Sequence, residues 1–289
     1  MHYHFQAEGE DRTIIEATDD HLDALIQFLN QNNKIHRHLD WHTPQEWLGK
    51  NPFLIEEKNG QIQAILCAIP ENNITAWVRA FGASQHSDLE KVWITLLEPA
   101  MNILQQMGIN QLASLALHQW FSDLLTRSTF DHHQNIIVLE WQGDLPKDFR
   151  YQDDVHIRPM LKGDLPDIAR LDHLAFPPLW QNSLSGLTKA FQQPGICTVA
   201  RLNNKIVGYQ ISTTMTIYGH LARLAVHPAY QRKGIATLLV DNLLKQFKNR
   251  GFWRITVNTQ SDNHSSLKLY QKFDFIPTKE EIPVYLLNL

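Results

Sequence analysis

Hydrophobic residues recur at three- and four-residue spacing from residue 235 to residue 247, which is the period of one buried helix face. An apolar run that ends at Val226 precedes this stretch, and Gly251 follows it as a stop signal. Between the run and the stretch lies a polar turn, Gln231-Arg-Lys-Gly234. The pattern predicts a strand, a turn and a helix, with a glycine and two cations at the helix entrance. Free N–H groups and the positive end of the helix dipole suit an anion there, such as pyrophosphate.

The first half of the chain shows the same order of patterns as the second half. Residues 13–22 and 155–165 each predict a strand, a turn and an amphipathic helix, and residues 53–66 and 197–211 each predict a hairpin. A helix over residues 89–106 would end near Gly108, and residues 122–130 parallel residues 267–275. We infer a tandem repeat of one domain. Residues 1–143 would form the first copy, residues 144–153 a polar linker with a proline, and residues 154–289 the second copy.

Composition agrees with a globular chain of two domains, since 43% of its 289 residues are hydrophobic and 19% are charged. A net charge of −4 gives no sign of nucleic-acid binding. We find no signal peptide and no apolar run long enough to span a bilayer, so we expect a cytoplasmic protein without a membrane partner, as a monomer or homodimer. Cys67 and Cys197 lie in separate apolar runs and are predicted to be buried free thiols in a reducing compartment.

Two motifs in the second half resemble those of the GCN5-related N-acetyltransferases, the GNAT superfamily. The pattern Gln231-x-x-Gly234-x-Ala236 after a strand resembles that family's pyrophosphate loop. Five positions downstream match its second signature, Asn-x-x-Ala-x-x-Leu-Tyr-x-x-x-Gly-Phe: Asn263, Ser266, Leu269, Tyr270 and Phe275. Ser266 replaces the usual alanine and Asp274 the usual glycine. The resemblance covers about residues 154–289 and implies an α/β fold of two tandem GNAT-like domains, each a mixed, mostly antiparallel twisted sheet flanked by helices.

The resemblance also implies the reaction: direct transfer of acetyl from acetyl-CoA to a primary amine, with no covalent enzyme intermediate and no metal. The backbone of the strand before the loop would contact the pantetheine arm and the thioester, and the loop amides would hold the pyrophosphate. Tyr270 would protonate the departing thiolate as general acid. The coenzyme residues so implied are Leu224, Ala225, Val226, Gln231, Arg232, Lys233, Gly234, Ile235, Ala236, Thr237, Asn263 and Ser266.

The general base and the acceptor are less defined by the sequence. Residues 218–226 contain no carboxylate, and His220 is the one residue there that titrates near neutral pH. A structural role for His220, with deprotonation of the amine by water, remains an alternative. Phe176 and Trp180 lie in a segment that resembles the Phe-Pro-x-x-Trp loop of enzymes that acetylate a ribosomal protein's N-terminus, and they would line an acceptor groove. Ordinary packing of a helix corner is the other interpretation, and both a small-molecule amine and a peptide N-terminus remain open as acceptor.

The first copy lacks the features that carry this chemistry. Residues 83–90 stand where its phosphate loop would be, without a glycine or a cation pair, and Asp88 and Glu90 would repel a pyrophosphate. Leu125 stands at the position that parallels Tyr270. We therefore predict a degenerate domain that binds no coenzyme and acts as a structural or substrate-covering partner. Its aromatic load is large for such a domain: Trp41, Trp47, Trp77 and Trp120.

A dense histidine cluster also lies in the first copy. His36, His38 and His42 surround Asp40, but their spacing differs from that of common metal ligands, so we predict no metal site. The alternative to an enzyme is a non-catalytic acetyl-CoA sensor or a scaffold. Calorimetry with acetyl-CoA and an assay of amine acceptors separate these functions.

Overall fold

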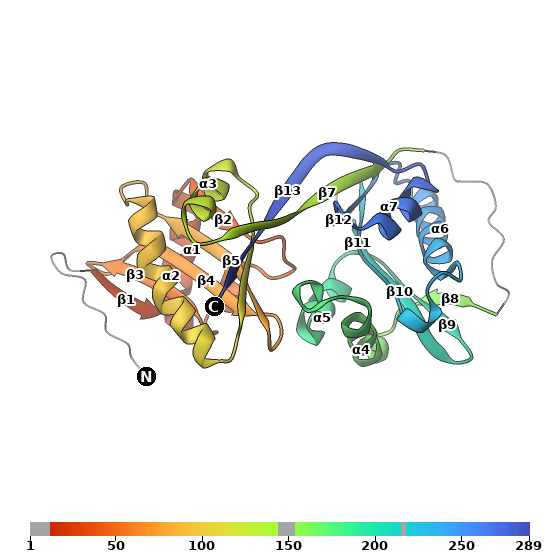
Figure 1. The fold of residues 1–289 in the computed structure, drawn as a ribbon, viewed down its shortest axis with the longest axis horizontal. Coiled ribbons are helices and arrows are strands. Elements are labelled where there is room, and N and C mark those ends of the chain that lie inside the picture. Colours follow the sequence, from red (N-terminus) through yellow and green to blue (C-terminus); the bar gives the residue numbers. More distant parts are fainter. Residues whose placement is uncertain (1–11, 144–153, 215–217) are drawn as a thin grey trace. The chain divides into compact units, whose positions relative to one another are not determined.

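The computed structural model describes residues 12–143, 154–214 and 218–289 (Figure 1). The predicted linker, residues 144–153, lies outside the described residues. The helices are α1 (Leu22–Gln31), α2 (Leu89–Gln106), α3 (Gln119–Arg127), α4 (Leu165–Ala175), α5 (Leu184–Gln192), α6 (Ile235–Asn249) and α7 (His264–Gln271). The strands are β1 (Arg12–Glu16), β2 (Lys34–Arg37), β3 (Phe53–Lys58), β4 (Gln61–Pro70), β5 (Thr75–Ala83), β6 (Gln111–Leu115), β7 (Asp131–Trp141), β8 (His156–Pro159), β9 (Gly195–Leu202), β10 (Lys205–Thr214), β11 (Gly219–Val226), β12 (Ile255–Gln260) and β13 (Ile276–Asn288).

The chain forms two compact units that exchange strands. The first unit comprises the described residues up to His133 together with Pro283–Leu289, and the second comprises Gln134–Ile282. Residues 136–141 of β7 pair with β12 in the second unit, whereas residues 284–288 of β13 pair with β6 in the first. This corrects the boundaries predicted from the sequence, which assigned residues 134–143 to the first copy and residues 283–289 to the second. Alternation of apolar residues identifies a strand but does not select its partner.

The sheet of the first unit separates two apolar layers, because successive side chains of a strand point to opposite faces. Its strand order is β1-β3-β4-β5-β6-β13, and β2 also pairs with β5. Leu54 and Leu66 face the layer that contains α2 and α3, while Ile55 and Ile65 face the layer that contains α1. Trp93 of α2 is almost fully buried in the first layer. The unit therefore has a complete core of its own.

The second unit is built in the same way, in the order β7-β12-β11-β10-β9-β8. Helix α6 packs on one face of this sheet through the predicted apolar stripe, and Leu239, Leu243 and Phe247 of that stripe are fully buried. A Cβ on Gly219 would come within 2.7 Å of the Phe247 ring, so this glycine lets the helix approach β11 closely. Helices α4 and α5 pack against each other, and α4 also contacts β10 and β11.

Most elements predicted from the sequence are confirmed. The two helices α2 and α6 begin and end where the apolar period and the glycines indicated. Both hairpins turn at the predicted dipeptides, with φ of +52° and +73° at Asn59 and Gly60 and of +47° and +64° at Asn203 and Asn204, which is typical of tight two-residue hairpin turns. Both cysteines are free thiols, as predicted, but only Cys67 is fully buried, whereas Cys197 is half-buried. Among the described helices, none is long and apolar enough to cross a bilayer.

The strand exchange predicts that residues 150–289 will not fold alone, although residues 134–289 will. Truncation at 150 removes the strand that pairs with β12 and removes Trp141, which is fully buried in the same cluster as Val257 and Phe247. Loss of one such side chain costs about 3–5 kcal/mol, which is a large share of a domain's stability. Thermal unfolding followed by circular dichroism should show a cooperative transition for residues 134–289 and none for residues 150–289. Equal transitions in the two fragments would show that β7 is dispensable.

Candidate active site

The two middle strands of the second unit diverge after three residue pairs. β11 and β12 are parallel and pair at Gly219–Ile255, His220–Thr256 and Leu221–Val257. β10 occupies the other edge of β11 along its length, up to Val226. On the edge that faces β12, no described strand pairs with residues 223–226. Apart from the Val226 carbonyl, which accepts from Gln231, the backbone groups on this edge have no partner in a described strand, and the predicted pantetheine arm would find donors and acceptors there.

The divergence leads directly to the predicted phosphate loop. Gln231 Nε2 donates to the carbonyl oxygen of Val226 at 3.1 Å, which fixes the loop to the end of β11. Gly234 is the N-cap of α6, with φ of +81°, and a Cβ there would meet no heavy atom within 4 Å. Arg232 and Lys233 are exposed beside it. Since the first N–H groups of a helix lack partners within it, Ile235, Ala236 and Thr237 present donors next to two cations.

The second motif supplies a helix cap and a buried phenol. Asn263 Oδ1 accepts from the backbone N–H of Ser266 at 3.1 Å and so caps α7. Tyr270, one turn later, is 4% exposed and packs on Phe275 with ring centroids 5.5 Å apart. Burial raises the pKa of the Tyr270 hydroxyl, which therefore keeps its proton at neutral pH.

His220 lies where β11 and β12 are still paired, at the closed end of the divergence. Its Nδ1 is 2.8 Å from Thr256 Oγ1, within hydrogen-bond distance. Burial lowers the pKa of His220 to about 4, so the ring is neutral at pH 7 and is a weak base. The geometry favours a structural hydrogen bond over a strong general base at this position.

Phe176 and Trp180 lie in the segment that follows α4, and both are held by a residue that sequence reasoning missed. The guanidinium of Arg223 on β11 stacks 3.5 Å from the Phe176 ring centroid and donates to the Trp180 carbonyl at 2.6 Å. Asp172 of α4 is the buried partner of Arg223. The sequence contained two signals for this pair. Arg223 is a charged residue within an apolar strand, and Asp172 is a carboxylate on an apolar helix face, seven residues after Leu165.

In the first unit, the equivalent opening is filled by the chain itself. β5 and β6 pair only at residues 75–77 and 111–113, but β2 then pairs with residues 80–83 of β5. Since β4 occupies the other edge of β5, β2 lies on the edge where β6 has diverged. The Ile35 side chain would come within 2.4 Å of a Cβ on Gly82, so the fit is tight. The backbone groups that a pantetheine arm would need are already paired.

The helix entrance of the first unit is also occupied. The Asp88 carboxylate caps α2 by accepting from the N–H groups of Glu90 and Lys91 at 3.1 and 3.2 Å. A pyrophosphate would need these N–H groups as donors. The negative charge of the Asp88 carboxylate would also repel the pyrophosphate. Leu125, which parallels Tyr270, is fully buried and apolar.

The histidine cluster continues from β2 into the core of the first unit. His36 is fully buried and stacks on Phe121, with ring centroids 4.1 Å apart. Asp40 forms an ion pair with Arg79 at 2.9 Å and approaches His42 Nδ1 at 3.1 Å. Within the described residues, no group of three or more histidine, cysteine or acidic side chains has a geometry that could hold a metal. Trp47 and Trp77 contact His42 and His38 there.

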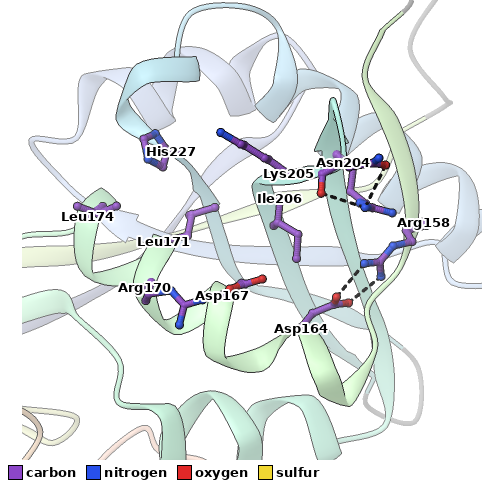
Figure 2. Close-up of a pocket in the computed structure, with 11 residues that line it drawn as sticks. Arg158, Asp164, Asp167, Arg170, Leu171, Leu174, Asn204, Lys205, Ile206 and His227 are labelled. Atoms are coloured by element: carbon purple, nitrogen blue, oxygen red, sulfur yellow. Dashed lines mark hydrogen bonds and ion pairs between the residues drawn. The ribbon is translucent and has the colours of Figure 1, made fainter.

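A pocket of about 430 Å³ lies between the start of α4, the β9–β10 turn and His227, which follows β11 (Figure 2). Its charged walls are partly neutralised, since Arg158 forms two hydrogen bonds to Asp164 at 2.7 and 2.8 Å and Arg170 pairs with Asp167. None of the predicted coenzyme or acceptor residues lines it. The lining residues are Arg158, Asp164, Asp167, Arg170, Leu171, Leu174, Arg201, Asn204, Lys205, Ile206 and His227.

Comparisons with known proteins agree with this geometry. Residues 165–275 match the model of the acetyltransferase (GNAT) family. A stretch of 100 residues is 31% identical to N-alpha-acetyltransferase 30 of Schizosaccharomyces pombe, covering 33% of this chain and 67% of that protein. A stretch of 87 residues is 30% identical to an acetyltransferase of Yersinia pestis, covering 30% of this chain and 62% of that protein.

The chain belongs to the GNAT acetyltransferase family. A solved tandem GNAT protein from the clavulanic acid biosynthesis pathway matches 96% of this chain, with a TM-score of 0.64 at 11% identity over 98% of its own length. At that identity the likeness concerns the fold, and it confirms the tandem GNAT architecture predicted from the sequence. Acetyl-CoA-dependent N-acetyl transfer is the activity that family membership supports.

The loop geometry predicts that Gly234→Ala will weaken acetyl-CoA binding without loss of the fold. The variant places a Cβ beside the helix donors at a positive φ, which l-residues adopt with strain. Gly251→Ala is a matched control, because Gly251 has φ of +83° and equally open surroundings at the other end of α6. Calorimetry should give at least about a tenfold higher Kd for Gly234→Ala than for Gly251→Ala, which corresponds to one lost hydrogen bond to a charged group. Equal Kd values would mean that the loop does not hold the pyrophosphate.

Buried neutral histidines predict loss of stability in mild acid. Burial lowers the pKa of His36 to about 3, from an ordinary value of 6.5. The unfolded chain therefore binds a proton at residue 36 below about pH 6.5 that the folded protein does not bind. The contribution of His36 to stability should fall from there toward pH 4 by up to about 1.4 kcal/mol per pH unit. His36→Phe should flatten this slope in urea unfolding, and the exposed His86→Asn should not. An unchanged slope in His36→Phe would contradict the assignment.

Proposed function

We propose that the second unit transfers acetyl from acetyl-CoA to the α-amine of a peptide or protein N-terminus. The observation that carries the proposal is the divergence of β11 from β12 immediately before a glycine-capped helix. It provides unpaired backbone groups for an extended thioester arm and helix donors for its pyrophosphate, in the order in which they occur in coenzyme A.

The coenzyme would be bound mainly by backbone groups. Leu224 and Val226 lie on the free edge of β11 and would contact the pantetheine arm and the thioester carbonyl. Residues from Arg232 to Thr237 would hold the pyrophosphate, with Gln231 supporting the loop through Val226. Asn263 and Ser266, at the start of α7, would border the arm on the β12 side. The first unit would bind no coenzyme, since β2 and Asp88 occupy the equivalent positions.

The departing thiolate needs a proton, and Tyr270 is suited to donate it. Its hydroxyl stays protonated in the buried site, and its helix begins directly after β12. The amine attacks the thioester carbon, the C–S bond breaks, and the Tyr270 proton would pass to sulfur as the thiolate leaves.

The acceptor amine must lose a proton before it attacks. His220 is a weak base, because burial lowers its pKa to about 4, and β11 carries no carboxylate. A peptide α-amine has a pKa of about 8, so roughly a tenth of it is neutral at pH 7, whereas a lysine amine with a pKa of about 10.4 is almost entirely charged. Without a strong base on β11, the site favours an α-amine, with water as proton acceptor, and this supports the N-terminal acceptor.

The relatives and the acceptor loop also support this class of acceptor. The yeast relative is by name an N-alpha-acetyltransferase. Phe176 and Trp180 flank two prolines, so the loop presents two aromatic side chains from a stiff backbone. A protein that acts on newly made chains would reside in the cytoplasm, where free thiols such as Cys67 and Cys197 persist.

A screen of amines tests the proposal. Free thiol release would be measured with acetyl-CoA and three groups of acceptors: peptides with a free N-terminus, N-terminally blocked peptides that contain lysine, and small polyamines. We expect turnover with the first group, rising with pH until the α-amine is neutral. Turnover with polyamines alone would identify a small-molecule enzyme, and acetyl-CoA binding with no acceptor at all would favour the sensor.

Replacement of Tyr270 by phenylalanine should lower kcat while acetyl-CoA affinity stays near that of the wild type. The ring and its packing on Phe275 remain, but the proton donor is lost. General acid catalysis contributes typically ~100- to 10,000-fold, and we expect the lower end because a thiolate is a good leaving group. Tyr285→Phe is the control, since Tyr285 is a buried tyrosine that bonds to Ser122 in the first unit. Full turnover of Tyr270→Phe on a confirmed acceptor would reduce Tyr270 to a packing residue.

A further inference from the structure

A buried ion pair connects α4 to the strand that precedes the coenzyme loop. Asp172 is fully buried, and Arg223 Nε and Nη2 donate to its two carboxylate oxygens, each at 2.8 Å. The Tyr209 hydroxyl of β10 also donates to Asp172. Burial and the nearby carboxylate raise the pKa of this hydroxyl, so it stays a donor. The pair is thus a two-pronged contact that fixes the plane of the guanidinium.

The same guanidinium holds the aromatic loop after α4. It lies 3.5 Å from the Phe176 ring centroid and donates to the carbonyl oxygen of Trp180 at 2.6 Å. Asp172 in turn accepts from the backbone N–H of Asn182 at 2.8 Å. The segment from Phe176 to Asn182 is therefore attached at three points to one ion pair.

The other end of Trp180 is held from a different strand. With its amide oriented to satisfy both neighbours, Gln134 accepts from Trp180 Nε1–H at 2.9 Å and donates to Asp262 at 3.3 Å. Gln134 lies in β7, two residues before the part of that strand that pairs with β12, and Asp262 lies just before α7. Trp180 is consequently clamped between Arg223 on β11 and Gln134 on β7.

Stability alone does not account for this arrangement. A buried ion pair is often no more stabilising than apolar residues of the same size, because both charges lose their water. What a bidentate pair supplies in addition is a fixed geometry. Arg223 immediately precedes Leu224, whose backbone is placed at the thioester arm in the proposed function, so one residue joins the acceptor loop to the coenzyme strand.

We infer that Arg223 and Gln134 are positioning residues that set the distance between the acceptor amine and the thioester by clamping Trp180. This inference rests on the proposed function, because it takes the loop over residues 176–182 as the acceptor wall. Neither residue takes part in proton or acetyl transfer. An error of about 1 Å in such a distance costs on the order of 100-fold in rate, so a loosened clamp affects acceptor turnover far more than coenzyme binding.

The test compares Arg223→Lys, Gln134→Leu and Arg158→Lys in the full chain. The lysine at 223 keeps the charge but loses the two-pronged contact and the stacking, while the leucine removes both hydrogen bonds of Gln134. Arg158→Lys is the matched control, because Arg158 also makes a two-pronged pair with an aspartate, at the start of α4. Three quantities are measured: acetyl-CoA Kd, kcat and acceptor KM with free N-terminal peptides, and amide hydrogen exchange of residues 173–183 and 228–240.

For Arg223→Lys we expect a fall in kcat/KM for the peptide of on the order of 100-fold, and a smaller fall for Gln134→Leu, of about tenfold. Acetyl-CoA Kd should change by less than about twofold, and exchange should rise in residues 173–183 but not in residues 228–240. Arg158→Lys should match the wild type in every measurement. If Arg223→Lys fails to fold, the half-buried Gln134→Leu decides the question.

Two results would overturn the inference. One is faster exchange in residues 173–183 with unchanged kcat and acceptor KM, since the clamp would then be structural only. The other is unchanged exchange in both clamp variants, which shows that the contacts do not hold the loop. If the wild-type protein acetylates none of the amines, the proposed function fails separately, and the exchange data alone decide whether Arg223 and Gln134 hold the loop.

Discussion

Both units depend on one constraint: a strand that loses its neighbour inside a protein must find other partners for its backbone N–H and C=O groups. β5 and β11 each pair with a parallel neighbour for three residues and then separate from it. The two units satisfy the released groups differently. In the first unit, β2 pairs with them, and in the second they are available to a ligand. This difference, more than any single side chain, separates a folded partner domain from a domain that can bind a coenzyme.

The helices that follow these two strands differ in the same way, since the N-terminal donors are satisfied internally in the first unit and left open in the second. Asp88 supplies its own carboxylate to the donors of α2, whereas Gly234 leaves the donors of α6 open. A helix N-terminus stabilises negative charge in either case. The carboxylate of Asp88 provides this negative charge permanently, whereas a phosphate group of a ligand provides it only when bound. The first unit therefore satisfies with its own β2 and Asp88 the strand edge and the helix donors that the second unit leaves open.

The sequence predicts those features whose physical signal is local. The period of α6, the hairpin turns at Asn59 and Asn203 and the loop at Gly234 follow from spacing and from residue types. The exchange of β7 and β13 does not, because alternation shows that a strand is half buried without showing what it pairs with. β2 was missed for another reason. Its four residues contain only one aliphatic side chain, and it pairs with β5 at the position where β6, which is distant in the sequence, has diverged. Of the candidate site, the glycine loop and the helix start at Gly234 were predictable from the sequence, and the Asp172–Arg223 pair was not, since 51 positions separate its members.

The absence of a carboxylate from β11 bears on the whole mechanism. An enzyme can lower the cost of deprotonating an amine with a matched base, or it can choose an amine that is already partly neutral. His220 is half-buried beside Thr256, and its desolvation opposes the charge that a strong base would have to accept. Under the proposed function, catalysis would depend on placing a neutral α-amine at the thioester and on protonating the thiolate. Positioning would then be the larger task of this site, and the buried Asp172–Arg223 pair that holds the loop over residues 176–182 is suited to that task.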